Sequence, residues 1–332
     1  MKFLKWTGFI VLLLIVVYFL GPKPSAPKYT NELPAIPTEP GLLQKYVSER
    51  EGLHRLKPDN EARIIWLNDS LKQQTEYAVV YLHGFSASQE EGDPVHLEFA
   101  RTFGCNLYLS RLAEHGIDTI DAMLNLKAEE LWNSAKEAYA IGKQLGRKVI
   151  ILATSTGGTL ALKLAAEYPD ITGLILLSPN IAINDPNAWL LNNPWGLQIA
   201  RLIKGKYNTS DDTAAMYKKY WYHKYRMESA VELEELLETT MKASLFEKVR
   251  QPTLLLYYFL DEEHQDDVVK VSAMKRMFRQ LGTPADLKRE IATAHTGDHV
   301  IGSYVKSKDI ETVKNECIKF GKEILKLPAA DR

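Results

Sequence analysis

One serine in the sequence stands between a strongly apolar run and a pair of glycines. Residues 149–158 read VIILATSTGG, with Ser155 near the middle. A serine hydroxyl becomes an effective nucleophile when a neighbouring base takes its proton. A strand that turns sharply into a helix at the serine exposes that hydroxyl, and small flanking residues allow the turn. The spacing makes Ser155 a candidate nucleophile. A phosphate-binding glycine turn and an ordinary strand-to-helix turn are the alternatives.

Candidate acids and bases follow two apolar runs nearer the C-terminus. Residues 253–259 precede the segment LDEEHQDDVV at 260–269, which supplies Asp261, Asp266 and Asp267. Residues 287–291 precede AHTGDHVI at 294–301, which supplies His295 and His299. A nucleophile elbow on an α/β sheet is followed along the chain by a carboxylate and then by a histidine. The sequence has this order.

Together with LHGFS at 82–86, these segments resemble the α/β-hydrolase family, in its esterase and monoacylglycerol-lipase-like branch, over about residues 75–325. The resemblance implies that Asp266, in DDVV, is the acid and that His299, in GDHV, is the base. Asp261 is the alternative acid because it lies nearer the strand end. Asp267 is interpreted as a helix cap and His295 as a loop residue. Ala153 departs from the family pattern, which has glycine two residues before the nucleophile.

The resemblance also implies an oxyanion hole. The backbone N–H groups of Phe85 and Thr156 are its expected donors, since such donors face the charge that develops on the acyl oxygen. His83 and Gly84 are expected to shape the first turn, and Gly157 to make room for the second. His115, in RLAEHG at 111–116, resembles the histidine of a family turn and is expected to be structural.

The elements that would position these residues alternate along the chain. Continuous apolar runs predict buried strands at 63–67, 77–82, 105–109, 149–153, 173–177, 253–259 and 287–291. Periodic apolar residues predict helices at 128–139, 160–168, 268–281 and 311–325. This alternation predicts an α/β fold with a doubly wound, mostly parallel sheet. Residues 181–250, rich in aromatic side chains, are interpreted as an inserted helical lid between core segments 42–180 and 251–332. Ordinary core helices are the alternative.

The N-terminus has a different character. Residues 1–20 carry two lysines before an apolar run, which predicts a membrane anchor, with a cleaved signal peptide as the alternative. The catalytic domain is then expected outside the cytoplasm. Six prolines between residues 22 and 40 make residues 21–41 a Pro-rich linker, interpreted as a stiff spacer.

Bulk properties exclude several classes of function. A net charge of −1 gives no electrostatic basis for nucleic-acid binding, and no metal-binding motif is present. Cys105 and Cys317 are expected to be buried thiols. The sequence therefore predicts a serine hydrolase that needs no cofactor and cleaves small acyl esters, such as acylglycerols or lysolipids. A thioesterase, a peptidase and a catalytically silent membrane-tethered binding module are the alternatives.

Overall fold

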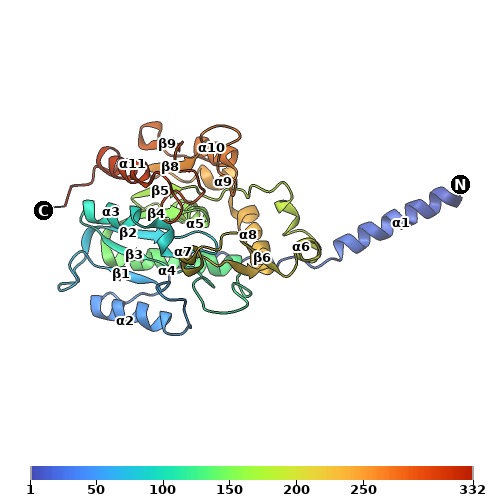
Figure 1. The fold of residues 1–332 in the computed structure, drawn as a ribbon, viewed down its shortest axis with the longest axis horizontal. Helices are drawn as coiled ribbons and strands as arrows, with labels where there is room; N and C mark the ends of the chain where they lie inside the picture. Colours follow the sequence, from blue (N-terminus) through green and yellow to red (C-terminus); the bar gives the residue numbers. More distant parts are fainter. Residues whose placement is uncertain (1, 331–332) are drawn as a thin grey trace.

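The computed structural model describes residues 2–330, with side chains from residue 6 onward. Its centre is a seven-stranded sheet in the order β1-β3-β2-β4-β5-β8-β9 (Figure 1). The strands are β1 (Arg63–Ile65), β2 (Thr75–Leu82), β3 (Asn106–Leu109), β4 (Gly146–Thr154), β5 (Gly173–Leu177), β8 (Thr253–Tyr258) and β9 (Lys288–Thr293). β1 is antiparallel to β3, and the other neighbouring strands are parallel. The predicted mostly parallel sheet is confirmed, and each predicted strand has a counterpart.

Helices cover both faces of this sheet. The bounds are α2 (Pro40–Glu51), α3 (Val95–Thr102), α4 (Ala128–Leu145), α5 (Thr156–Glu167), α9 (Ala243–Phe246), α10 (Val271–Gln280) and α11 (Ile310–Glu323), with short 3-10 turns η1 (Gln89–Gly92) and η3 (Ala285–Leu287). Val80 and Ile151 belong to one apolar cluster with α4, α5 and α10, whereas Val79 and Ile150 belong to another with α3 and α11. Alternate residues of a strand point to opposite faces, so strands buried on both sides appear as continuous apolar runs. Cys105 and Cys317 are free and buried, as expected.

The strand order reverses between β2 and β4. From β4 the chain continues outward through β5, β8 and β9, whereas β3 and β1 lie on the other side of β2. The register pairs Leu82 with Ala153, so the segments after β2 and β4 emerge side by side. In open α/β sheets ligands bind outside the carboxyl ends of the strands at such a switch point. The topology therefore brings the turn at 83–86 and Ser155 to the same edge.

The segment 181–250 lies over this edge. It contains η2 (Ala188–Leu190), α6 (Gly196–Lys204), β6 (Tyr207–Thr209), α7 (Ala215–Tyr220), β7 (Lys224–Arg226) and α8 (Met227–Thr240), and ends with α9. β6 and β7 form a small antiparallel sheet that the predicted all-helical pattern lacks. α8 packs against both α4 and α6. The insertion thus has its own secondary structure and packs against the core. Its boundaries at residues 181 and 250 stay a prediction from the sequence.

At the N-terminus, α1 (Lys2–Phe19) projects from the body beside α6 (Figure 1). Within the described part of the chain, no helix combines the length and the apolar content that crossing a membrane requires. The predicted single-pass anchor is therefore not supported.

The segment after α1 corrects another expectation, because it is not a free spacer. Tyr29, Leu33 and Ile36 pack against the core cluster of α4 and α5. The Trp132 indole donates to Thr30 O (2.7 Å), and the Tyr168 hydroxyl donates to Asn31 O (2.7 Å). Prolines hold the segment extended, and in this form it can lie along a helical surface as a strap. We call residues 28–36 the strap.

Candidate active site

Ser155 lies at the turn between β4 and α5. Its backbone has φ 52° and ψ −118°, a conformation that L residues rarely adopt. The turn brings helix α5 close to β2: a methyl group on Gly157 would lie 2.0 Å from Leu82 O. Only glycine fits at that position. Ala153, by contrast, is fully buried in the core cluster on the strand itself, so its extra methyl group fits where the family pattern has glycine.

Asp266 and His299 form a buried pair. Asp266 follows β8 and His299 follows β9, and the His299 Nδ1–H donates to Asp266 Oδ2 at 2.6 Å. The other oxygen of Asp266 accepts the N–H groups of Val268 and Val269 (3.0 and 2.9 Å). These bonds orient the carboxylate toward the ring and place the imidazole proton on Nδ1, which leaves Nε2 as a base.

Charge at this pair favours the imidazolium. Burial lowers the pKa of His299, but the Asp266 carboxylate opposes it, with Glu91 and Asp298 contributing in the same direction, and the net result raises the pKa of His299 to about 9. A base of this strength holds a proton well once it has taken it. It must, however, be deprotonated before the reaction starts.

The structure places the alternative residues elsewhere. Asp261 is exposed and accepts the N–H groups of Glu263 and His264, closing its own turn, while its carboxylate contacts the His264 ring. Asp267 and His295 are also exposed. Among the carboxylates of this loop, Asp266 is the one bonded to His299.

The turn after β2 is held by three buried side chains. His83 donates from Nδ1 to Gly84 O (2.9 Å) and accepts the Leu112 N–H on Nε2 (3.0 Å). His115 Nε2 accepts the Ser86 N–H (3.0 Å), and the Glu91 carboxylate accepts the Gly84 N–H. Burial lowers the pKa of His83 well below its usual value and that of His115 to about 4, so both rings are neutral in ordinary buffers. The Phe85 peptide lies between these fixed points.

A cavity of ≈ 760 Å³ joins these elements. Phe85, Ser155 and His299 line it at the sheet edge. Apolar residues of the insertion line it farther out: Ile183, Leu190, Leu191, Ile199, Ile203 and Leu233. Its size is ordinary for a small-molecule site. Phe85, Ser155 and His299 thus share one cavity with an apolar wall.

Sequence reasoning missed two residues of this cavity, Glu91 and Trp221. Glu91 is buried beside Ser155, and burial raises its pKa to about 7. Trp221, from the insertion, lines the same cavity and stacks on Tyr217, with ring centroids 5.5 Å apart. Glu91 belongs to a polar loop without any motif. The nearest sequence signal was a carboxylate pair, Glu90 and Glu91, shortly after the HG turn.

Comparisons with known proteins agree with this geometry. Residues 131–299 match the family described as serine aminopeptidase, S33. A thermostable monoacylglycerol lipase of Bacillus sp. (strain H-257) is 29% identical over 186 residues, which are 56% of this chain and 70% of that protein.

Solved structures share the fold at low sequence identity. A structure of the metagenome-derived lipolytic enzymes LipS and LipT has a TM-score of 0.63 at 17% identity, over 80% of this chain and 98% of that one. The monoacylglycerol lipase of Paleococcus ferrophilus has a TM-score of 0.57 at 15% identity, over 80% and 98%. A soluble variant of the Saccharomyces cerevisiae monoglyceride lipase has 0.56 at 12%, over 78% and 90%.

The family match spans the Ser155 turn, Asp266 and His299, and the sheet is that of the solved lipases. The chain belongs to the serine aminopeptidase S33 family of α/β-hydrolases.

Proposed function

We propose that Ser155, His299 and Asp266 form the catalytic triad. His299 Nε2 takes the Ser155 hydroxyl proton as the oxygen attacks the acyl carbon, and it then returns the proton to the leaving alcohol. Water, deprotonated by the same nitrogen, attacks the acyl-enzyme and releases the acid. The observation that carries this proposal is a strained serine turn that shares a cavity with a buried histidine, which is itself bonded to a buried carboxylate.

Two backbone N–H groups, of Phe85 and Thr156, are proposed to bind the oxyanion. Thr156 is the first residue of α5, where unpaired N–H groups and the helix dipole favour negative charge. Phe85 stands in the turn that His83, His115 and Glu91 hold from three sides. Donors fixed before the reaction need no reorganisation as charge develops, and one such donor is worth roughly 10²–10³ in rate.

We propose a monoacylglycerol or a similar single-chain acyl ester as the substrate. The aliphatic wall supplied by the insertion suits one acyl chain, and polar groups gather where the ester must lie. The relatives named as monoacylglycerol lipases favour the same class. In this reading residues 181–250 act as a lid over the acyl chain.

A chain-length series of p-nitrophenyl esters tests the activity and the substrate class. The wild type is expected to prefer medium or long acyl chains over acetate, and Ser155→Ala is expected to lose hydrolysis while it keeps its melting temperature. A fluorophosphonate probe should label the wild type and not Ser155→Ala.

Full activity in Ser155→Ala would remove Ser155 from the mechanism. A folded wild type that neither labels nor hydrolyses any ester would favour the silent binding module. Faster cleavage of a thioester or of an amino-acid p-nitroanilide would favour a thioesterase or a peptidase.

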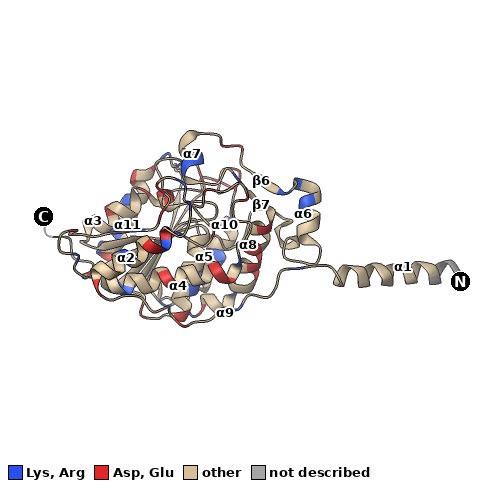
Figure 2. Cartoon of the chain, turned by 90° about the horizontal axis from the view of Figure 1, so that it is seen from below, with Lys and Arg blue, Asp and Glu red and all other residues tan. Residues whose placement is uncertain are grey.

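We also propose that α1 attaches the enzyme to a lipid surface. Residues 6–19 have no charged side chain and stand clear of a body that carries both signs of charge (Figure 2). Their large side chains are exposed, between 40% for Tyr18 and 71% for Phe19. Exposure of so many apolar side chains is costly in water, and their contact with lipid is favourable. Which side of a membrane the catalytic domain faces stays a prediction from the sequence.

A further inference from the structure

Glu91 is a buried carboxyl group that the proposed mechanism does not use. It lies in η1 and is 2% exposed, and it lines the cavity together with Ser155 and His299. Its carboxylate accepts the Gly84 N–H. A methyl group placed on Gly84 would lie 2.8 Å from both carboxylate oxygens of Glu91 and 2.8 Å from Ser155 Cβ. The carboxylate and the proposed nucleophile thus flank the same glycine.

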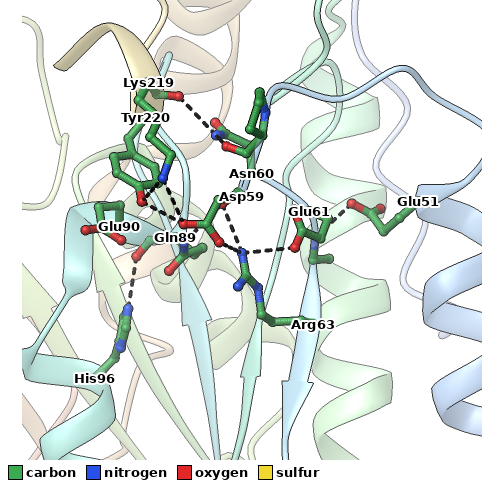
Figure 3. A network of polar contacts seen from close by, with 12 residues as sticks. Glu51, Asp59, Asn60, Glu61, Arg63, Gln89, Glu90, His96, Lys219 and Tyr220 are labelled. Atoms are coloured by element: carbon green, nitrogen blue, oxygen red, sulfur yellow. Dashed lines mark hydrogen bonds and ion pairs between the residues drawn. The ribbon is translucent and has the colours of Figure 1, made fainter. Parts of the chain in front are cut away.

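The loop that carries Glu91 is fixed on both sides. In the network of Figure 3, the His96 ring bonds to Gln89 O (2.9 Å), and the Gln89 side chain donates to Asp59 O (3.3 Å). Asp59 is in turn held by Arg63 and by Tyr220 of α7 (both 2.6 Å). The loop is therefore tied to α3, to the start of β1 and to the insertion. The Glu91 side chain on this loop is buried and bonded to Gly84 N–H, so its charge lies beside the site.

Resting on the proposed esterase function, we propose that Glu91 is a positioning residue. Its carboxylate holds the His83–Gly84 peptide, and so restrains the next peptide unit, whose Phe85 N–H faces the acyl oxygen. Protonation of Glu91 weakens this restraint and with it the oxyanion hole. A bond from an N–H to a carboxylate is roughly twice as strong as one to a neutral group. His83 and His115, which hold the rest of the turn, stay neutral across the same pH range.

Several groups face Glu91 from the elements around it. His299 and Asp298 come from the loop after β9, Tyr81 from β2, and Tyr217 from α7. Burial raises the pKa of Glu91 to about 7, against the opposing effects of the Gly84 N–H and His299. The Glu91 carboxylate also contributes to the raised pKa of His299. The two groups therefore titrate in different ranges but influence each other.

Protonation of either His299 or Glu91 is expected to lower kcat/KM. His299 has to lose its proton to act as a base, and Glu91 has to lose its proton to hold the turn. As pH falls, log(kcat/KM) is expected to decline with a slope of one below a pH of about 9 and with a slope of two below about 7. A conventional triad with a single essential base gives a slope of one throughout the acid limb.

The test is the pH profile of kcat/KM for a p-nitrophenyl ester, read at the isosbestic wavelength of p-nitrophenol, in the wild type, Glu91→Gln and Glu91→Ala. Glutamine keeps an acceptor for Gly84 N–H but does not titrate. Glu91→Gln, which is neutral like protonated Glu91, should have a lower kcat/KM plateau than the wild type and should lose the second break. Its His299 break should move to lower pH, because a nearby negative charge is gone. Glu91→Ala should lower kcat by up to roughly 10²-fold, the scale of one lost oxyanion donor, with KM little changed. Glu90→Gln is the matched control: it neutralises the adjacent carboxylate, which bonds to Tyr304 outside the cavity, and should keep the wild-type profile.

Each outcome decides the proposal. It is overturned if Glu91→Gln keeps both breaks, if the wild type shows a single slope down to pH 5, or if Glu91→Ala keeps the wild-type kcat. A Glu91→Ala protein that fails to fold leaves the decision to Glu91→Gln, whose side chain has nearly the same shape. A wild type that hydrolyses no ester overturns the esterase proposal itself. An active wild type whose pH profile is unchanged by substitution of Glu91 overturns only the role of Glu91.

Discussion

The backbone at Ser155 is strained, and a non-glycine residue in such a conformation costs about 1–3 kcal/mol. Hydrogen bonds on both sides hold it. The Ser155 N–H donates to Leu177 O (3.0 Å), and Ser155 O accepts the N–H groups of Gly158 (2.8 Å) and Asn180 (2.9 Å). Each such bond contributes about 1 kcal/mol, enough together to offset the strain. The turn is thus supported by main-chain contacts, which is why Ser155→Ala is expected to fold.

Asp266→Asn tests the proposed triad acid. An asparagine amide at this position can donate to His299 Nδ1 and move the imidazole proton to Nε2, which removes the base. It also removes the charge that raises the pKa of His299. We expect kcat at pH 8 to fall by roughly 10³–10⁴-fold, with the melting temperature lowered only modestly.

Asp261→Asn is the matched control for this change. It neutralises a carboxylate of the same loop that bonds to its own turn and to His264. Steady-state kinetics with one p-nitrophenyl ester should show less than about a two-fold effect there. A larger loss of kcat in Asp261→Asn than in Asp266→Asn would transfer the role of the acid to Asp261.

The residues of the candidate site that stand in short sequence motifs could be predicted from the sequence. Ser155 and His299 stand in short segments whose local order identifies them. The choice between Asp261 and Asp266 depends on how the loop after β8 folds: Asp261 turns back on residues 263 and 264, which leaves Asp266 for the histidine. Glu91 could not be identified, because its role arises from a loop held by residues far apart in the sequence, such as Asp59 and His96.

At the scale of the elements, the strands were predictable because burial on both faces demands unbroken apolar runs. The strap and the β6–β7 pair were not. Residues 28–36 have no periodic pattern, and prolines in such a segment equally suit a free tether. Its position on α4 and α5 comes from individual tertiary contacts, such as Tyr29 packed on the core cluster and Thr30 O bonded to Trp132. β6 and β7 have three residues each, too short for alternation to show.

Trp195 links α1 to the insertion. It starts α6, its indole donates to Val17 O (3.0 Å), and its N–H donates to Pro22 O (2.9 Å). A methyl group on Gly21 would lie 2.2 Å from the indole ring, so the ring packs directly on that glycine. Ile199 and Ile203 of the same helix line the cavity. Trp195 thus contacts the end of α1 and belongs to the same helical segment as two residues of the cavity wall.

Trp195→Ala is expected to loosen the end of α1. Losing the indole bond and its packing should cost about 1 kcal/mol of local stability, which corresponds to roughly five-fold faster local opening. Limited chymotrypsin digestion measures this as the rate of cleavage after Tyr18–Leu20. Trp189→Ala, which removes an exposed tryptophan of the same segment, should cleave at the wild-type rate. Equal rates in both variants would show that the Trp195 contact does not restrain α1.

On the scale of the whole molecule, the N-terminal forty residues divide into two parts with different roles. α1 projects and exposes its apolar side chains, whereas the strap is part of the folded body (Figure 1). Three strap side chains, Tyr29, Leu33 and Ile36, pack on the core cluster. At about 1 kcal/mol for each partly buried side chain, they stabilise the fold by about 3 kcal/mol. Truncations can separate attachment to lipid from stability.

A chain that begins at residue 21 is expected to keep its melting temperature within about 2 °C and to keep its kcat on a soluble ester, but to stop floating with phosphatidylcholine vesicles. A chain that begins at residue 39 is expected to melt roughly 10 °C lower, because each kcal/mol shifts the midpoint of a chain this size by about 2–4 °C. Differential scanning calorimetry and vesicle flotation measure the two effects.

Leu13→Lys in the full-length chain completes the set, since it places a charge in the middle of the apolar run of α1 without shortening the chain. Burying a charged side chain in lipid is costly, so this variant should bind vesicles less while it melts as the wild type does. Flotation of the chain that begins at residue 21 would assign the lipid contact to the body instead of α1. Equal melting temperatures for the two truncations would mean that the strap lies on α4 and α5 without stabilising them.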